Sequence, residues 1–425
     1  MRQNWLISTQ VNDENNGSLQ VVVTSLIGNR PIVGAVVKIG YAGIPDSAVA
    51  EEITDQNGQT PEISLIAPSI NYSMEPSVNQ PYSQYTILVS AAGFEPVEVE
   101  GAQILPDTLA IQEITMIPTE NALGNGNTAE LFVIPSNTLY GDYPPKIAEN
   151  EIKTREESGE IVLSRVVIPE YVVVHDGPPS DSSANEYYVK YKDYIKNVAS
   201  SEIYATWPEA AIYANVLAIQ SFTLNRVYTE WYRNKGYTFT ITSSTAFDHK
   251  WVAGRNIFDN ISEIVDNIFS NYLSRPSVTQ PILTQYCDGQ RVQCPGWMTQ
   301  WGSKYLADQG YSAIEILRYF YGDDMYINST TEISGIPSSW PGQNLTIGTS
   351  SDKIRQMQNQ LNVISKSYPL IPKVIADGIY GEQTAEAVRT FQKIFRLPQT
   401  GVVDFPTWYR ISEIYVGVSR IAELN

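Results

Sequence analysis

The sequence predicts a multidomain protein with an N-terminal all-β sandwich, a central region of mixed α and β structure and a C-terminal domain of three helices. Its length predicts several domains, because 425 residues exceed what one hydrophobic core usually serves. Its composition predicts folded cores, since 43% of the residues are apolar and 11% are aromatic. Its pattern changes along the chain, from short β-branched runs to longer helical periodicities.

The charge of the chain argues against several classes of partner. The formal net charge is -18, from 28 Lys and Arg against 46 Asp and Glu. A protein that binds phosphates would repel them unless it carried a basic patch, and no run of Lys and Arg supplies one. No segment approaches the about 18 uninterrupted apolar residues of a membrane span. The start of the chain lacks the pattern of a secretory signal. We therefore expect no nucleic acid partner, no membrane span and no Sec export.

Residues 1–118 predict an antiparallel β-sandwich. Runs such as SLQVVVTS and IVGAVVKIGYAG are rich in β-branched residues, and turn stretches such as TDQNGQT separate them. This block contains no His and no Cys. A scaffold, binding or inhibitory role therefore fits it better than catalysis.

Residues 119–166 have the composition of a linker. ENALGNGNTAE and KIAENEIKTREESGEIVLSR are polar stretches without sustained periodicity. Composition alone favours a plain tether between two folded blocks. A protease could reach such a tether, so a processed segment is the alternative.

Residues 167–345 mix long helices with short extended runs. A helix is predicted to begin at Trp207 or Pro208, because Thr206 and Glu209 have the spacing of a capping box. It is expected to run to about residue 234. The stretch NIFDNISEIVDNIFSNYLS has apolar residues at helical spacing and predicts a second helix.

Residues 346–425 predict three helices with Pro- and Gly-bearing loops between them. The helical stretches are SSDKIRQMQNQLNVIS, GEQTAEAVRTFQKIF and DFPTWYRISEIYVGVSR. The block is small enough to form a separate module, and SGIPSSWPGQNLTIG marks the boundary before it.

Histidine and cysteine chemistry finds little support in the sequence. The two histidines, His175 and His249, lie near no Gly-flanked Ser and no nucleophilic Cys pattern. Cys287 and Cys294 have six residues between them, which is wider than the usual two to four of a structural zinc site. A disulfide or two reduced packing cysteines is favoured over zinc. No phosphate loop or dinucleotide motif is present, so no cofactor is expected.

A carboxylate remains as the candidate catalytic group. If KYKDYIKNVASSE is helical, Ile195, Val198 and Glu202 fall at helical spacing, so Glu202 lies beside an apolar stripe. An apolar environment disfavours the charged form and raises the pKa, as a general acid requires. The alternative is that Glu202 caps a helix or forms a salt bridge. Aromatic residues such as Trp207 and Trp301 could line a carbohydrate cleft or belong to the core.

Two stretches resemble a known enzyme family. YIKNVASSEIYATWPEAA and YCDGQRVQCPGWMTQWGSKYLADQG are similar to the SpoIID-type lytic transglycosylase domain. The resemblance extends over nearly all of the chain to clostridial spore cortex-lytic enzymes, which are made as proenzymes. It implies a prepeptide sandwich (1–118), a prosegment (119–166), an α+β SpoIID-like catalytic domain (167–345) and a peptidoglycan-binding domain (346–425).

The resemblance assigns roles to particular residues. The acid of the family falls on Glu202, and the substrate-binding candidates are Trp207, Asp288, Gln300 and Trp301. The sequence departs from the family pattern at four positions. These are Trp297 in place of glycine, Cys294 where many members carry histidine, and Asn215 and Gln220 where Gln and Arg are usual.

The last block carries a further motif. IADGIYGEQTAEAVRTFQKIF is similar to the peptidoglycan-binding repeat, which predicts cell-wall binding and not catalysis. The matching residues are Asp377, Gly378, Tyr380, Gly381 and Thr384 in the turn, followed by Phe391 and Gln392.

The implied reaction needs one acid, which would protonate the bond between N-acetylmuramic acid and N-acetylglucosamine and then act as base while a 1,6-anhydro ring closes. The implied partners are spore cortex peptidoglycan and a subtilisin-like germination protease that cuts around Arg165, Val166 and Val167. The implied site of synthesis is the mother cell, with deposition in the spore. A wall-binding or coat-assembly protein without turnover is the competing expectation.

Overall fold

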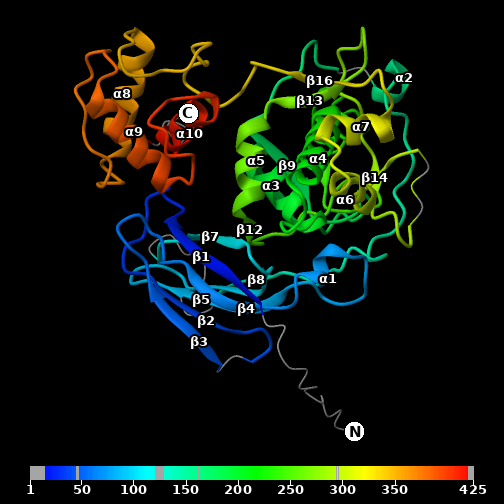
Figure 1. Cartoon of the computed structure of the whole chain (residues 1–425), viewed down its shortest axis with the longest axis horizontal. Helices are drawn as coiled ribbons and strands as arrows, with labels where there is room; N and C mark the ends of the chain where they lie inside the picture. The colour runs from blue at the N-terminus through cyan, green and yellow to red at the C-terminus, as the bar shows by residue number, and fades with distance from the viewer. Residues whose placement is uncertain are drawn as a thin grey trace.

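The computed structural model describes residues 15–44, 47–119, 129–159, 162–292, 294 and 296–419. Along the chain it has a β-rich N-terminal region, a central region of helices and short strands, and a helical C-terminal region (Figure 1). Within these described ranges, no helix is both long and apolar enough to cross a membrane.

The N-terminal region consists of two packed sheets. Their strand orders are β12-β7-β1-β4 and β3-β2-β5-β6-β8, in which β8 is Glu130–Val133 and β12 is Ile257–Phe258. Alternation explains the packing, since Leu19, Val21 and Val23 on one face of β1 are fully buried. A short helix, α1 (Asn71–Met74), follows β4. The strand bounds are β1 Asn15–Ser25, β2 Val36–Tyr41, β3 Ala48–Ile53, β4 Ile63–Ala67, β5 Ser83–Ser90, β6 Val97–Ile104 and β7 Leu109–Met116.

The predicted all-antiparallel arrangement is wrong for two pairs of strands. β1 runs parallel to β7, and β6 runs parallel to β8 (Glu130–Val133). A hairpin joins antiparallel strands, and neither of these two pairs is joined by one. In each pair, a longer connection brings the second strand back in the same direction as the first. The remaining neighbours in the two sheets are antiparallel.

The predicted linker is more than a tether. β8 adds to the N-terminal sheet, and α2 (Arg155–Ser158) has a capping box made by Thr154 and Glu157. Between them, residues 137–153 make side-chain and backbone hydrogen bonds to the central region. The polar composition of residues 119–166 suggested an exposed tether. In the structure, its polar groups instead find hydrogen-bond partners in the central region.

The central region is built around two buried helices, α3 (Tyr191–Glu202) and α4 (Glu209–Tyr228). Smaller elements surround them. These are β9 Tyr171–His175, β10 Glu186–Lys190, a 3-10 turn Arg233–Lys235, β11 Ile241–Thr242, β12 Ile257–Phe258, α5 Asp259–Ile268, β13 Asn271–Ser274, β14 Tyr286–Cys287, β15 Met298–Thr299, α6 Gln300–Asp308, α7 Ala313–Tyr321 and β16 Tyr326–Ser329.

Both helices predicted in this region have different ends in the structure. α4 begins after Pro208, which is its N-cap, and ends at Tyr228. The predicted capping box is wrong, because Pro208 is the N-cap and, in the described ranges, no side chain accepts a hydrogen bond from the first backbone N–H groups of the helix. The Thr206 hydroxyl instead donates to Ser73 Oγ at 2.8 Å. The second predicted helix is shortened to α5, since residues 257–258 pair with β7 and residues 271–274 pair with β16. Pairing with distant strands overrides the helical periodicity in both flanks.

The C-terminal region contains the three predicted helices, α8 (Asp352–Ile364), α9 (Glu382–Ile394) and α10 (Phe405–Ser419). Their apolar faces meet around residues such as Ile354, Phe391 and Trp408, which are almost fully buried. In Figure 1 this region lies beside α5 of the central region and above the N-terminal sheets.

Candidate functional site

Glu202 is the last residue of α3 and is only 2% exposed. As predicted, it follows an apolar stripe, since Ile195 and Val198 are fully buried. Its Oε1 accepts a hydrogen bond of 2.6 Å from the Lys250 backbone N–H, and its Oε2 accepts one from the Tyr286 hydroxyl. Among the described residues, its carboxylate makes no ion pair. The structure therefore does not support the alternative that Glu202 forms a salt bridge.

The environment of Glu202 favours a protonated carboxyl. Burial raises the pKa of Glu202, while the Lys146 ammonium, the Lys250 N–H and the Tyr286 hydroxyl act in the opposite direction. The net pKa is above its usual value. A buried carboxyl of this kind can hold a proton at higher pH than an exposed one, which is the property of a general acid.

The pocket at Glu202 is very small. Its volume is about 20 Å³, roughly the space of one water molecule. Asp288 and Gln300 were predicted to bind substrate, and both line this pocket with Glu202. A sugar ring cannot enter a space of this size. The lining residues are Tyr143, Pro144, Lys146, Glu202, Thr245, Tyr286, Cys287, Asp288, Val292 and Gln300.

Part of the pocket wall comes from the predicted prosegment. The Lys146 ammonium donates to the carbonyls of Thr245 (3.3 Å) and Asp248, and it lies 4.9 Å from the centre of the Tyr286 ring. Burial lowers the pKa of Lys146. The Tyr143 hydroxyl donates to the Ser201 carbonyl at 3.2 Å. Residues of the predicted prosegment therefore cover the Glu202 carboxyl group.

The two predicted pocket residues are also occupied by structural contacts. Asp288 Oδ2 accepts a hydrogen bond of 2.6 Å from the Gly141 N–H, which lies in the predicted prosegment. The Gln300 side-chain amide donates to the Glu202 backbone carbonyl at 2.8 Å. Gln300 thus fixes the end of α3, and Asp288 holds the covering segment in place.

Trp207 and Trp301 do not line the pocket. Their rings lie 5.0 Å apart in a buried aromatic group with Tyr204. The indole N–H of Trp207 donates to the Ser73 carbonyl at 2.8 Å, and that of Trp301 donates to the Leu139 carbonyl at 2.9 Å. Both acceptors precede the predicted catalytic domain. The structure therefore gives these tryptophans a packing role in this form of the chain.

Two residues at the site were missed by sequence reasoning. Tyr286 was not singled out, although it precedes Cys287 and lies two residues before Asp288. Lys146 was assigned to a linker. Neither has a local sequence pattern that indicates proximity to Glu202, since both reach it through the tertiary fold.

The departures from the family pattern at Asn215 and Gln220 lie in the core. Asn215 donates to Ser303 Oγ at 2.7 Å, and Gln220 donates to the Ile268 carbonyl at 3.0 Å. Both side chains are buried and hold α4 against neighbouring elements. Neither lines the pocket at Glu202.

Cys287 and Cys294 form a disulfide. This selects one of the alternatives that the spacing left open, because bonded sulfurs are not available as zinc ligands. In the part of the chain that the structure describes, no group of three or more His, Cys, Asp and Glu residues is placed to hold a metal ion.

The predicted cleavage region is partly protected. The Arg165 side chain is 67% exposed and pairs with Glu332 at 3.1 Å. Val166 is buried, and its carbonyl accepts a hydrogen bond from the Thr330 hydroxyl. Val167 is half-buried. The exposed positions in this stretch are therefore before Val166, at residues 162, 164 and 165.

The motif residues of the last block hold two turns. Gln358 of α8 accepts from the Gly378 N–H (2.9 Å) and donates to the Ile379 carbonyl (2.9 Å) and Thr384 Oγ1 (3.1 Å). Gly378 has φ of 83°, where a side chain is strained. Asp377 closes the same turn by accepting from the Ile379 N–H at 2.8 Å.

Gln392 of α9 repeats this arrangement. It accepts from the Gly401 N–H (2.8 Å) and donates to the Val402 carbonyl (2.9 Å) and Thr407 Oγ1 (3.2 Å). Tyr380 is fully buried and donates to the Gly401 carbonyl, and Phe391 is also fully buried. These motif residues therefore build the module, whereas Gly381 precedes α9 as its N-cap.

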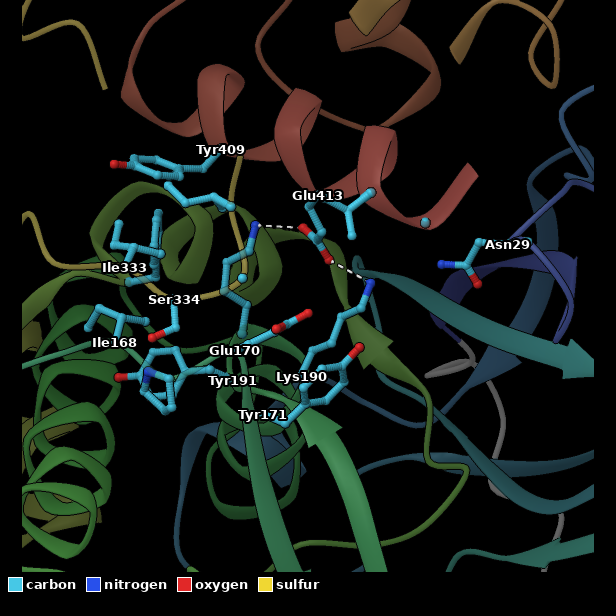
Figure 2. Close-up of a pocket in the computed structure, with 18 of the residues that line it drawn as sticks. Asn29, Ile168, Glu170, Tyr171, Lys190, Tyr191, Ile333, Ser334, Tyr409 and Glu413 are labelled. Atoms are coloured by element: carbon cyan, nitrogen blue, oxygen red, sulfur yellow. Dashed lines mark hydrogen bonds and ion pairs between the residues drawn. The ribbon is translucent and has the colours of Figure 1, made fainter. Parts of the chain in front are cut away.

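A larger cavity lies between the three regions, away from Glu202 (Figure 2). Its volume is about 250 Å³, and apolar residues such as Ile168, Ile333 and Tyr409 form part of its wall. Lys190 and Lys192 each pair with Glu413 of α10 at 3.2 Å. The charges on its wall thus join the C-terminal region to the central region.

Comparison with known proteins identifies the C-terminal domain. Residues 350–411 match the family model described as "Putative peptidoglycan binding domain". The C-terminal region therefore carries a peptidoglycan-binding domain. No curated protein matches the chain.

Solved structures give weaker likenesses. The Bacillus anthracis TIE protein is 14% identical over 24% of this chain and 17% of its own, with a TM-score of 0.17. The minor pilin of Streptococcus agalactiae is 14% identical over 26% and 48%, with a TM-score of 0.18. Hydroxyquinol 1,2-dioxygenase from Pseudomonas putida is 14% identical over 25% and 58%, with a TM-score of 0.19. The chain spans less than two thirds of each, and no argument rests on scores this low.

Proposed function

We propose that this chain is the latent form of a peptidoglycan lytic transglycosylase with Glu202 as its acid and base, similar to the clostridial spore cortex-lytic enzyme SleC. The observation that carries the proposal is the Glu202 carboxyl, which is buried, has a raised pKa and lies in a pocket with Asp288 and Gln300. The peptidoglycan-binding domain supports the same substrate class, because it would hold the chain on the cell wall.

The proposed reaction uses Glu202 twice. Its proton passes to the glycosidic oxygen between N-acetylmuramic acid and N-acetylglucosamine as that bond breaks. The carboxylate then takes the proton of the muramyl O6 hydroxyl, and O6 closes on C1 to form the 1,6-anhydro ring. No attacking water and no second carboxylate are needed, in contrast to ordinary glycoside hydrolysis. Tyr286 is placed to stabilise the carboxylate after the first transfer.

Latency is part of the proposal. A pocket of about 20 Å³ admits no saccharide, and the prosegment residues Tyr143 and Lys146 form part of its wall. We propose that a subtilisin-like germination protease cuts near Arg165 to Val167, and that the chain is made in the mother cell and deposited in the spore. The protein would then meet cortex peptidoglycan in an inactive state.

Product analysis tests the proposed reaction. Purified cortex is incubated with the processed protein after its N-terminal part has been removed completely, and the soluble muropeptides are identified by mass spectrometry. We expect products that end in 1,6-anhydromuramic acid. The Glu202→Gln variant should lose these products by several orders of magnitude and still bind insoluble peptidoglycan. Reducing-end products would instead mean hydrolysis, and cleavage that survives Glu202→Gln would exclude Glu202 as the acid.

The same structural features favour a second candidate, a wall-binding or cortex-assembly protein without turnover. Glu202, Trp207 and Trp301 are all at most 5% exposed, and their polar atoms are bonded within the protein. Binding to peptidoglycan without any released muropeptide, after complete removal of the N-terminal part, would support this candidate.

A further inference from the structure

We propose that the chain up to residue 159 stays bound to the chain after residue 165 as a separate, noncovalent subunit when the connection near Arg165 is cut. The inference concerns the regulation of the proposed site and rests on the proposed processing. Its test measures association of the two fragments and not catalysis, so it can fail while the proposed enzyme activity holds.

One sheet contains strands from both fragments. β12 of the central region pairs with β7, with Ile257 opposite Ile111 and Phe258 opposite Ala110. β12 is therefore the strand that covers the outer edge of β7 (Figure 1). The Gln112 side chain adds a hydrogen bond of 2.9 Å to the Gly254 carbonyl. Separation of the fragments would expose this edge.

A buried polar contact lies beside the shared sheet. The Asn256 side chain accepts from the Gln103 N–H at 2.8 Å and donates to the Gln103 carbonyl at 2.9 Å. Arg255 donates to Gln103 Oε1 at 2.6 Å. The three residues are at most 6% exposed. A buried polar group that loses its partner costs free energy until water can reach it. This contact therefore opposes separation of the fragments.

A second buried contact fixes the prosegment. The Arg226 side chain is 0% exposed and donates two hydrogen bonds, of 2.9 and 2.6 Å, to the two carboxylate oxygens of Glu149. Lys153 also pairs with Glu149 at 2.7 Å. Removal of the prosegment would leave Arg226 with Asp248 as its remaining carboxylate partner. A bidentate pair of this kind fixes the geometry of the two side chains in addition to pairing their charges.

Two glutamines of the central region bind the prosegment backbone. Gln285 accepts from the Glu149 N–H at 2.9 Å and donates to the Ile147 carbonyl at 2.7 Å. Gln280 accepts from the Lys153 N–H at 2.7 Å and donates to the Lys153 carbonyl at 3.2 Å. The backbone of this segment is thus hydrogen-bonded to glutamine side chains both before and after Glu149.

These contacts lie directly next to the covered acid. Lys146 is one residue before the backbone that Gln285 holds, and it lines the pocket of Glu202. A cut near Arg165 breaks none of the contacts named above. The pocket at Glu202 therefore remains covered after the cut, and opening it requires a second event that separates the fragments.

The test uses the full chain with a site-specific protease sequence inserted between Ser164 and Arg165, both of which are exposed. After complete cleavage, we expect the two fragments to elute together in native gel filtration at physiological ionic strength and to give one complex in native mass spectrometry. Hydrogen exchange at the Lys250 amide, which donates to Glu202, should be unchanged by the cut. Fragments that elute separately, or of which one precipitates alone, would overturn the inference.

Variants in the prosegment test the buried ion pair. Glu149→Ala should lower the urea concentration at which the cut fragments separate. Glu156→Ala, an exposed glutamate of the same segment, is the matched control and should leave that concentration unchanged. Equal effects of the two variants would exclude Glu149 as a specific contact. Faster exchange at the Lys250 amide with the fragments still together would show that the cut itself opens the pocket.

Discussion

Two opposing effects act on the pKa of the Glu202 carboxyl group. Burial disfavours its charge, and the hydrogen bonds from Tyr286 and Lys250 favour it. The balance is a pKa above the usual value. A carboxyl in this state costs stability when it is ionised, because the folded protein binds its proton more tightly than the unfolded chain does. Stability is therefore expected to fall as the pH rises from the unfolded pKa through the folded one.

Glu202→Gln should remove this cost. We expect the variant and the wild type to unfold at similar temperatures below about pH 4.5, where both side chains are neutral. Above that pH the variant should become the more stable protein, by about 1.4 kcal/mol for each unit by which the folded pKa exceeds the unfolded one. Thermal unfolding between pH 4 and pH 7 measures the difference. Glu209→Gln, at an exposed glutamate, controls for the loss of one negative charge, and a gain that is equal in both variants would contradict the argument.

The sequence identified part of this site for a physical reason. Glu202 lies on the same helix as its apolar neighbours, so periodicity alone placed it beside the buried stripe. Tyr286 is 84 positions away along the chain and Lys146 is in another region, so no local pattern connects them with Glu202. Trp207 and Trp301 were identified as aromatic residues near the acid, but their burial depends on Ser73 and Leu139, which only the fold brings together.

At the level of elements, the C-terminal module uses one arrangement twice. A glutamine on a helix, Gln358 or Gln392, binds the backbone of the turn that leads to the next helix and the threonine at its start. Each turn contains a glycine with positive φ, Gly378 or Gly401. The motif that predicts peptidoglycan binding is thus explained mainly by the geometry of these connections.

Gln358→Leu should destabilise the module. The substitution removes hydrogen bonds to Gly378, Ile379 and Thr384 and leaves buried backbone groups without partners, so we expect a loss of about 2 kcal/mol or more in unfolding free energy. Chemical unfolding followed by circular dichroism measures it. Gln356→Leu, at a half-exposed glutamine of the same helix, is the matched control. A Gln358 variant as stable as this control would mean that the turn does not depend on the glutamine.

The elements themselves were predicted where packing follows local periodicity. α3 and the three C-terminal helices carry apolar faces that the sequence displays. The predicted capping box of α4 was wrong because Pro208 is the N-cap and Thr206 bonds to Ser73. The predicted ends of α5 were wrong because residues 257–258 join a sheet of the N-terminal region and residues 271–274 pair with β16. Such competitors lie far away in the sequence, so propensity and capping patterns cannot include them.

In the whole molecule, charged residues join the C-terminal domain to the rest. Although burial opposes ionisation of Glu413, the ammonium of Lys192 and the guanidinium of Arg410 hold its pKa well below the usual value. Lys190 also pairs with Glu413 across the cavity of Figure 2. A lowered pKa means that this contact contributes stability above about pH 4.5 and loses it as the pH falls toward the folded pKa.

Glu413→Gln should loosen this junction. The variant leaves Lys190, Lys192 and Arg410 with one fewer negative partner, so we expect the C-terminal domain to separate more readily from the central region at neutral pH. Small-angle scattering should give a larger radius of gyration, and acidification of the wild type toward the lowered folded pKa of Glu413 should change the radius in the same direction. Glu386→Gln, which removes an exposed ion pair with Arg389, should have no effect. An unchanged radius for Glu413→Gln would assign the junction to apolar packing.

The strand that β12 contributes to the N-terminal sheet also has a consequence for biosynthesis. β7 leaves the ribosome before residues 119–166, α3 and α4 are made, so its outer edge has no partner during that time. An unpaired edge accepts strands from neighbouring nascent chains, which is a route to aggregation. When residues 257–258 emerge and pair with β7, the same step protects the edge and positions α5 next to the finished sheet. Slow translation between residues 116 and 257 would therefore prolong the time for which the edge of β7 is open to such pairing.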